Sequence, residues 1–114
     1  MMQKKRILIF PFNLMSHYLR CITLAKRYSN CDILFASSGS YNSFVFEAGY
    51  QIFETETFDA ELVMKQAAEF SFAWLNKTDI EKVFLSQVKV IQDLKPDLVI
   101  GDTSPTLKMA AEKT

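Results

Sequence analysis

The chain's single histidine, His17, is its side chain best suited to acid–base chemistry, because imidazole gains and loses a proton near neutral pH. His17 lies between an apolar run and a predicted helix, and Asp102 follows another apolar run near the end of the 114-residue chain. A carboxylate on one imidazole nitrogen fixes the tautomer and leaves the other nitrogen free to take a proton. Together the two residues are a candidate general-base dyad, provided that the fold brings them together.

Both residues also have a purely structural interpretation. A lone histidine at the start of a helix is often a solvated surface residue. Asp102 stands next to Thr103 and Ser104 and could merely help to cap the last helix. Spacing alone leaves both interpretations open.

The two cysteines bear on the cellular compartment. Cys21 falls on the apolar face of a predicted helix and Cys31 precedes a strand, so we expect reduced, buried or half-buried thiols rather than a disulfide framework. The basic, apolar start resembles a secretory signal, but Pro11 and Asn13 interrupt it, and no other stretch approaches the ~20 apolar residues of a membrane span. We expect a cytoplasmic protein, with peripheral attachment to a membrane left open.

Composition and charge exclude several classes of function. With 114 residues, 49% of them hydrophobic, we expect one domain with a core of its own, over residues 1–114. Thirteen basic residues balance thirteen acidic ones, so there is no electrostatic footprint for nucleic acid. Only three glycines occur, and neither a GxGxxG nor a P-loop motif can be written. One histidine, two separated cysteines and no close acidic cluster argue against a metal site.

Short apolar runs alternate with segments in which apolar residues recur at helical spacing, and this pattern predicts the element order βαβαβααβα. Buried strands are expected at 7–10, 32–36, 51–53 and 98–100, and helices at 17–28, 41–48 and 59 to about 75. A further helix is predicted from a capping box at Thr78 and Glu81 to just before Pro96, and a last one from Ser104 and Pro105 onward. This alternation indicates a Rossmann-like α/β fold, with a parallel sheet of order 3-2-1-4 and helices on both faces.

The predicted topology has a consequence for the two candidate site residues. In such sheets the ligand site lies beyond the carboxyl ends of the strands. With order 3-2-1-4 the first and fourth strands are neighbours, so the loops that follow them face each other. We therefore expect His17 and Asp102 within hydrogen-bonding reach, directly or through one water.

Five segments, in order from about residue 7 to 114, resemble motifs of the UDP-glycosyltransferase family. PFNLMSH at 11–17, followed by LAKR at 24–27, resembles the signature P-x-x-x-x-G-H-x-x-P-x-x-x-L-A-x-x-L. DILFAS, FEAGY, KPDLVIGD and AAEK, at 32–37, 46–50, 95–102 and 110–113, are similar to the family's next strand, its E-A-A-G-L element, its K-P-D-L-V-V-x-D element and the helix after it. Two positions depart from the pattern, since Ser16 replaces a glycine and Arg20 the usual proline.

The resemblance implies roles for the two site residues. His17 would be the base that deprotonates the acceptor hydroxyl, and Asp102 would orient it. The reaction would be inverting transfer of a hexose from a UDP-sugar, as co-substrate and without metal or other cofactor, to a hydroxyl of a small-molecule or lipid acceptor. The acceptor would lie near Phe12 and Met15 and near an apolar helix holding Phe70 and Trp74, although such aromatic residues at helical spacing usually pack in a core.

The resemblance also implies that the chain contains only one of the two domains of such an enzyme. It corresponds to the amino-terminal, acceptor-side domain of the two-domain GT-B fold, shortened at its end, and the nucleotide-sugar domain is absent. We expect this chain to be inactive alone. The alternative is a non-catalytic binding or partner module that pairs with a separate donor-binding subunit. In both cases the strand at 98–100 would lie at the edge of the sheet, where it could pair with a second copy in a homodimer.

Overall fold

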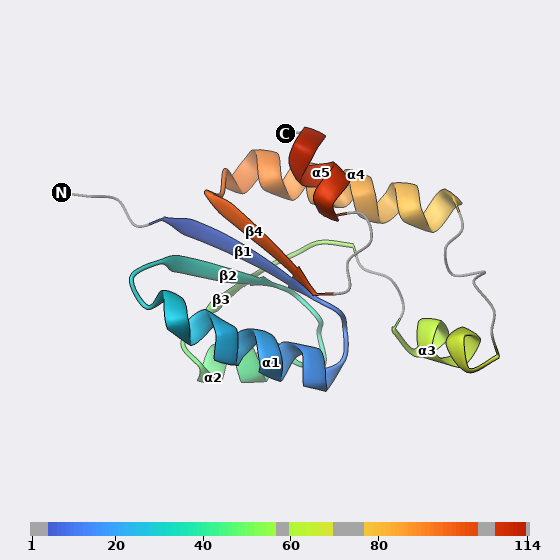
Figure 1. The fold of residues 1–114 in the computed structure, drawn as a ribbon, viewed down its shortest axis with the longest axis horizontal. Helices are drawn as coiled ribbons and strands as arrows, with labels where there is room; N and C mark the ends of the chain where they lie inside the picture. The colour runs from blue at the N-terminus through green and yellow to red at the C-terminus, as the bar shows by residue number, and fades with distance from the viewer. Residues whose placement is uncertain (1–4, 57–59, 70–76, 103–106, 114) are drawn as a thin grey trace.

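The computed structural model describes residues 5–56, 60–69, 77–102 and 107–113 of the chain (Figure 1). The strands are β1 (Arg6–Pro11), β2 (Asp32–Ala36), β3 (Gln51–Phe53) and β4 (Leu98–Asp102). The helices are α1 (Met15–Ala25), followed by a 3₁₀ turn (Lys26–Tyr28), α2 (Asn42–Glu47), α3 (Ala60–Ala68), α4 (Lys77–Leu94) and α5 (Leu107–Lys113). None of the helices in these ranges is long and apolar enough to cross a membrane.

The four strands form one parallel sheet in the order β3-β2-β1-β4. The predicted α/β class and strand order are therefore confirmed. β1 is central, with Leu8 opposite Leu34 of β2 and opposite Val99 of β4. The last pair in register between β1 and β4 is Pro11 with Asp102, so both strands end at the same edge of the sheet. The segment that follows β1 therefore starts beside Asp102.

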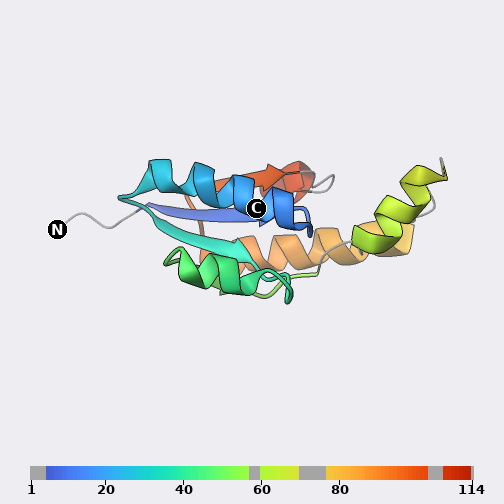
Figure 2. The same ribbon diagram turned by 90° about the horizontal axis from the view of Figure 1, so that it is seen from below.

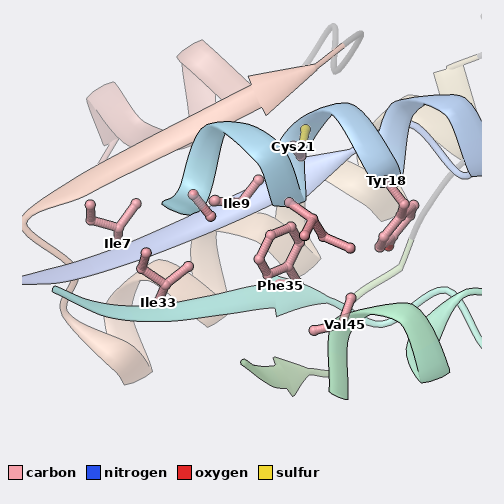
Figure 3. Packing of buried hydrophobic residues seen from close by; sticks show 9 residues of the cluster. Ile7, Ile9, Tyr18, Cys21, Ile33, Phe35 and Val45 are labelled. Carbon is pink, nitrogen blue, oxygen red and sulfur yellow. The ribbon is translucent and has the colours of Figure 1, made fainter. Parts of the chain in front are cut away.

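Helices cover both faces of the sheet, as Figures 1 and 2 show, with α1 and α2 on one face and α4 and α5 on the other. Side chains alternate along β1: Ile7 and Ile9 face α1, whereas Leu8 and Phe10 face α4 and α5. Because both faces of β1 are covered, its sequence is a continuous apolar run. Figure 3 shows the first of these two clusters, which is formed by Ile7, Ile9, Tyr18, Cys21, Ile22, Ala25, Ile33, Phe35 and Val45.

Some helix boundaries differ from the predictions. α1 begins at Met15, two residues early, because the Leu14 carbonyl already accepts hydrogen bonds from the N–H groups of His17 and Tyr18. α4 begins at Lys77, so Thr78 lies inside the helix, and the predicted capping box at its start was wrong. α3 spans Ala60–Ala68, and most of the rest of the helix predicted to about residue 75 falls outside the described residues. Residues 70–76 and the predicted cap at 104–105 lie outside the described residues.

β4 forms where predicted, but the prediction that it is buried was wrong. Leu98 is 44% exposed, Val99 and Ile100 are only half-buried, and Gly101 is exposed. The reason is the position of β4 at the end of the strand order, where among the described strands it has a neighbour, β1, on one side only.

Candidate functional site

His17 is placed by the turn between β1 and α1. After Pro11 the chain turns, with the N–H of Leu14 donating to the carbonyl of Phe12 at 2.7 Å. Leu14 is extended, and α1 starts directly after it, which puts His17 at the third position of the helix. The imidazole therefore lies at the carboxyl edge of the sheet, where parallel sheets bind their ligands.

Asp102 meets His17 from the neighbouring strand. It is the last residue of β4 and pairs in register with Pro11. Nδ1 of His17 lies 3.1 Å from Oδ2 of Asp102, and each side chain is 20% exposed. The predicted proximity of the two side chains is thus found in the structure. An imidazole with Nδ1 bound to a carboxylate can use Nε2 as a proton acceptor.

Arg20 is a third member of the site. From the sequence, Arg20 was identified only as a departure from the family pattern, where it replaces the usual proline. Its Nη2 and Nε donate to Oδ2 of Asp102 at 2.7 and 3.2 Å. The same Nη2 lies 3.0 Å from Nδ1 of His17. Residues three apart on a helix are neighbours, so the spacing of Arg20 from His17 was a usable signal. The Arg20 side chain is 64% exposed, against 20% for Asp102.

The charges around Asp102 favour its ionised form. Burial of the carboxylate opposes this, but hydrogen bonds from Arg20 and His17 outweigh burial, so the pKa of Asp102 is held below its ordinary value. The bond to Asp102 in turn raises the pKa of the Arg20 guanidinium. The site thus contains a fixed negative charge and a fixed positive charge within 3 Å of each other.

Cys21 contributes a protonated thiol beside the same carboxylate. Its Sγ lies 3.8 Å from Oδ2 of Asp102, at the limit of a weak hydrogen bond. Burial, and then the charge of Asp102, raise the pKa of the Cys21 thiol to about 11. At neutral pH the thiol is therefore a weak donor to Asp102 and a poor nucleophile.

Tyr18 fixes the start of α1 against the sheet. Its side chain is buried, and its hydroxyl donates to the carbonyl of Ala36, the last residue of β2. Burial raises the pKa of the Tyr18 hydroxyl, so it stays a neutral donor. Because His17 precedes Tyr18, this anchor also restricts how far the imidazole can move.

The predicted acceptor-binding residues fall into two groups. Phe12 is buried against Val63 of α3 and Val83 of α4, and its ring meets the His17 ring edge-on at 5.4 Å. Met15 is 50% exposed at the first position of α1. Phe70 and Trp74 lie outside the described residues. Phe12 thus supports the imidazole from the protein side, Met15 offers apolar surface to solvent, and their contact with an acceptor stays a prediction.

A cavity of about 910 Å³ opens at the opposite end of the sheet. Its lining includes Arg6, Asp32, Leu94 and Asp97, where the strands begin. Arg6 donates to Asp32 Oδ2 at 3.1 Å, to the Leu94 carbonyl at 2.8 Å and, through its backbone N–H, to Asp97 Oδ2 at 2.8 Å. These groups satisfy one another and tie β1 to its neighbours. We therefore assign this cluster a structural role and place the candidate site at the His17 edge.

Comparison with known proteins adds no family assignment: no protein-family model and no curated protein matches the sequence. The resemblance to UDP-glycosyltransferases therefore rests on the motifs alone. The geometry of His17 and Asp102 is an observation independent of that resemblance.

Proposed function

We propose that this chain is the acceptor-side domain of an inverting glycosyltransferase, which transfers a hexose from a UDP-sugar to a hydroxyl of a small or lipid acceptor. The observation that carries the proposal is the 3.1 Å contact between His17 Nδ1 and Asp102 Oδ2. It joins the two residues to which the motif resemblance assigns the base and its orienting carboxylate. It also lies at the edge of the sheet where this fold class binds ligands.

The mechanism uses the dyad as a general base. Asp102 accepts the Nδ1–H of His17 and so leaves Nε2 unprotonated. Nε2 takes the proton of the acceptor hydroxyl while its oxygen forms a bond to the anomeric carbon. The bond from that carbon to the UDP oxygen breaks, UDP leaves with the electron pair, and the anomeric configuration inverts. The carboxylate of Asp102 then stabilises the imidazolium.

Two neighbours keep the imidazole in place for this step. Phe12 packs edge-on against its ring and is itself held by Val63 and Val83. Tyr18 anchors the same turn of α1 to the end of β2. A base held this way loses little orientational freedom on binding an acceptor, which is a main part of catalysis by positioning.

The test needs both the acceptor-side domain and a domain that binds the nucleotide-sugar. In a protein that joins this chain to a nucleotide-sugar-binding domain, His17→Ala should lower kcat by about 10²–10⁴, the usual worth of a general base. UDP release from UDP-glucose or UDP-galactose in the presence of hydroxylated aromatic and lipid acceptors measures it. Lys26→Ala, a change at an exposed position directly after the same helix, is the matched control and should leave kcat unchanged.

Two outcomes would count against the proposal. An unchanged rate in His17→Ala with the acceptor still bound would make His17 a surface residue without a catalytic role. An acceptor that binds but is never glycosylated would favour the alternative, a binding module that pairs with a separate donor-binding subunit.

A further inference from the structure

Three polar atoms of the site form a nearly equilateral triangle. His17 Nδ1 lies 3.1 Å from Asp102 Oδ2 and 3.0 Å from Arg20 Nη2, and Oδ2 and Nη2 are 2.7 Å apart. Each side of the triangle has the length of a hydrogen bond. The chemistry of the three groups, however, does not allow all three hydrogen bonds at once.

Nδ1 of a neutral imidazole carries either one proton or one lone pair. The guanidinium of Arg20 only donates, and the ionised carboxylate of Asp102 only accepts. Nδ1 can therefore donate to Asp102 or accept from Arg20, but it cannot do both. If Nδ1–H donates to Asp102, then two donors, Nδ1–H and the Arg20 N–H, face each other. If Nδ1 accepts from Arg20, then two acceptors, Nδ1 and Oδ2 of Asp102, face each other.

The two arrangements differ in what happens at the far nitrogen. When Nδ1–H donates to Asp102, Nε2 is unprotonated and can act as a base. When Nδ1 accepts from Arg20, the proton of the neutral ring is on Nε2, which then cannot accept another. Arg20 favours the second arrangement and Asp102 the first.

We propose that Arg20 competes with Asp102 for Nδ1 of His17 and thereby sets the fraction of the imidazole whose Nε2 can take a proton. Arg20 acts through His17 and is a positioning residue. The catalytic consequence rests on the proposed function, whereas the tautomer itself is a property of the described side chains. The 64% exposure of the Arg20 side chain means that its removal leaves no cavity in the core.

Nitrogen NMR of the 114-residue chain tests the competition directly. The chain has one histidine, so its imidazole ¹⁵N signals need no assignment among several residues. Measured at about pH 9, well above the usual range of imidazole titration, the two ¹⁵N shifts report the tautomer. Arg20→Met should move the population toward Nδ1–H, and Asp102→Ala should move it toward Nε2–H. Arg27→Met removes the same charge two turns further along and should leave the shifts unchanged.

The inference is decided by the directions in which Arg20→Met and Asp102→Ala change the tautomer population. Unchanged His17 shifts in Arg20→Met, or a shift in the same direction in both variants, would overturn it. Because Arg20 is largely exposed, Arg20→Met decides the matter alone if Asp102→Ala does not give a folded spectrum.

The transfer reaction gives a second, separate readout. In the joined protein, Arg20→Met should raise kcat in proportion to the gain in the competent tautomer, roughly twofold if both tautomers are equally populated in the parent. Unaltered kcat despite an altered tautomer would overturn the catalytic part of the inference. No transfer in any variant would count against the proposed function and would leave the tautomer measurement valid.

Discussion

A single oxygen atom organises the candidate site. Oδ2 of Asp102 accepts from Arg20, lies within hydrogen-bond distance of His17 and is approached by the thiol of Cys21. Because a carboxylate oxygen accepts several hydrogen bonds, and because Arg20 stays charged at all accessible pH values, the negative charge of Asp102 is strongly retained. Most electrostatic properties of the site follow from this one atom.

The depressed pKa of Asp102 predicts a specific pH dependence of stability. A carboxyl whose pKa is lower in the folded than in the unfolded chain adds stability above its unfolded pKa, and this is lost as pH falls through the folded pKa. Arg20→Met removes hydrogen bonds that lower the pKa of Asp102. The loss of unfolding free energy in Arg20→Met should therefore be largest near neutral pH and shrink in acid. Urea denaturation from about pH 7 down to about pH 2 measures it.

The matched control for that experiment is Arg27→Met, which removes the same charge from an exposed position. Its destabilisation should not follow the titration of a carboxyl group below about pH 5. An equal pH dependence in both variants would show that only the net charge of the chain matters.

The two cysteines should differ sharply in reactivity. With a pKa of about 11, the Cys21 thiol is ionised to only about one part in 10³ at about pH 8, and it is also buried. Cys31 is half-buried and lies directly before β2. Iodoacetamide should modify Cys31 first, as mass spectrometry of the labelled peptides would show, and the difference should disappear in denaturant. Faster labelling of Cys21 in the folded chain would contradict the burial described here.

How far the sequence predicts the site depends on the type of residue. The contact between His17 and Asp102 was predictable, because strand order and strand ends place both residues and their side chains are short. The position of the Arg20 guanidinium was not, because a long side chain has many rotamers and its partner is 82 residues away.

At the scale of elements, two helices end in different ways. After α2, Gly49 has φ +91°, and the N–H groups of Gly49 and Tyr50 donate to the carbonyls of Phe46 and Val45, a Schellman motif. Directly after α4, Lys95 has φ +47°, and its N–H donates to the carbonyl of Ile91. Lys95 therefore occupies a left-handed position that usually holds glycine.

We expect Lys95→Gly to raise the free energy of unfolding by about 1 kcal/mol, since a residue with a Cβ pays to adopt left-handed backbone angles. Gly49→Ala is the reverse change at the end of α2 and should lower stability by about 1 kcal/mol. Guanidinium denaturation of both variants beside the parent measures the two effects. A destabilised Lys95→Gly would mean that the lysine side chain contributes more than its backbone costs.

The elements were predictable where burial dictates the sequence pattern. β2 and β3 have the predicted bounds, because their apolar runs are short and bounded by turn residues. Helix starts were less predictable: α1 begins after Leu14 without a capping side chain, and Thr78 lies inside α4 rather than at its cap. Helix ends depend on local backbone geometry and on packing against neighbours, to which a pattern of residue types is less sensitive.

At the scale of the molecule, the proposed function assigns to this chain only the acceptor side of a transfer site. Its sequence has three glycines and contains neither of the glycine-rich motifs that commonly cradle a pyrophosphate. We therefore expect the chain alone to neither transfer sugar nor bind UDP-sugars tightly. Titration calorimetry with UDP-glucose measures the binding, and a micromolar affinity would place a donor site on this domain.

The position of β4 at the edge of the sheet bears on whether the molecule associates with a second copy. The sequence of β4, LVIGD, starts with an apolar run of the kind buried in parallel sheets, yet Leu98 is 44% exposed. On the side away from β1, no strand among the described residues covers its backbone groups. Such an edge is a template for pairing with another chain. α5, with seven described residues, is shorter than the ~12–15 residues at which isolated helices become even marginal, so it depends on packing.

We therefore predict that the chain self-associates through β4, in a symmetric dimer that pairs the two edges. Sedimentation velocity over a hundredfold range of concentration should show a monomer–dimer equilibrium. Leu98→Lys should shift it toward monomer, because a lysine on an edge strand opposes pairing. Leu85→Lys, at an exposed apolar position on α4, is the matched control and should leave the equilibrium unchanged. If the parent is strictly monomeric at every concentration and melts cooperatively, then β4 is sufficiently protected within one chain, and its exposed leucine is no interface.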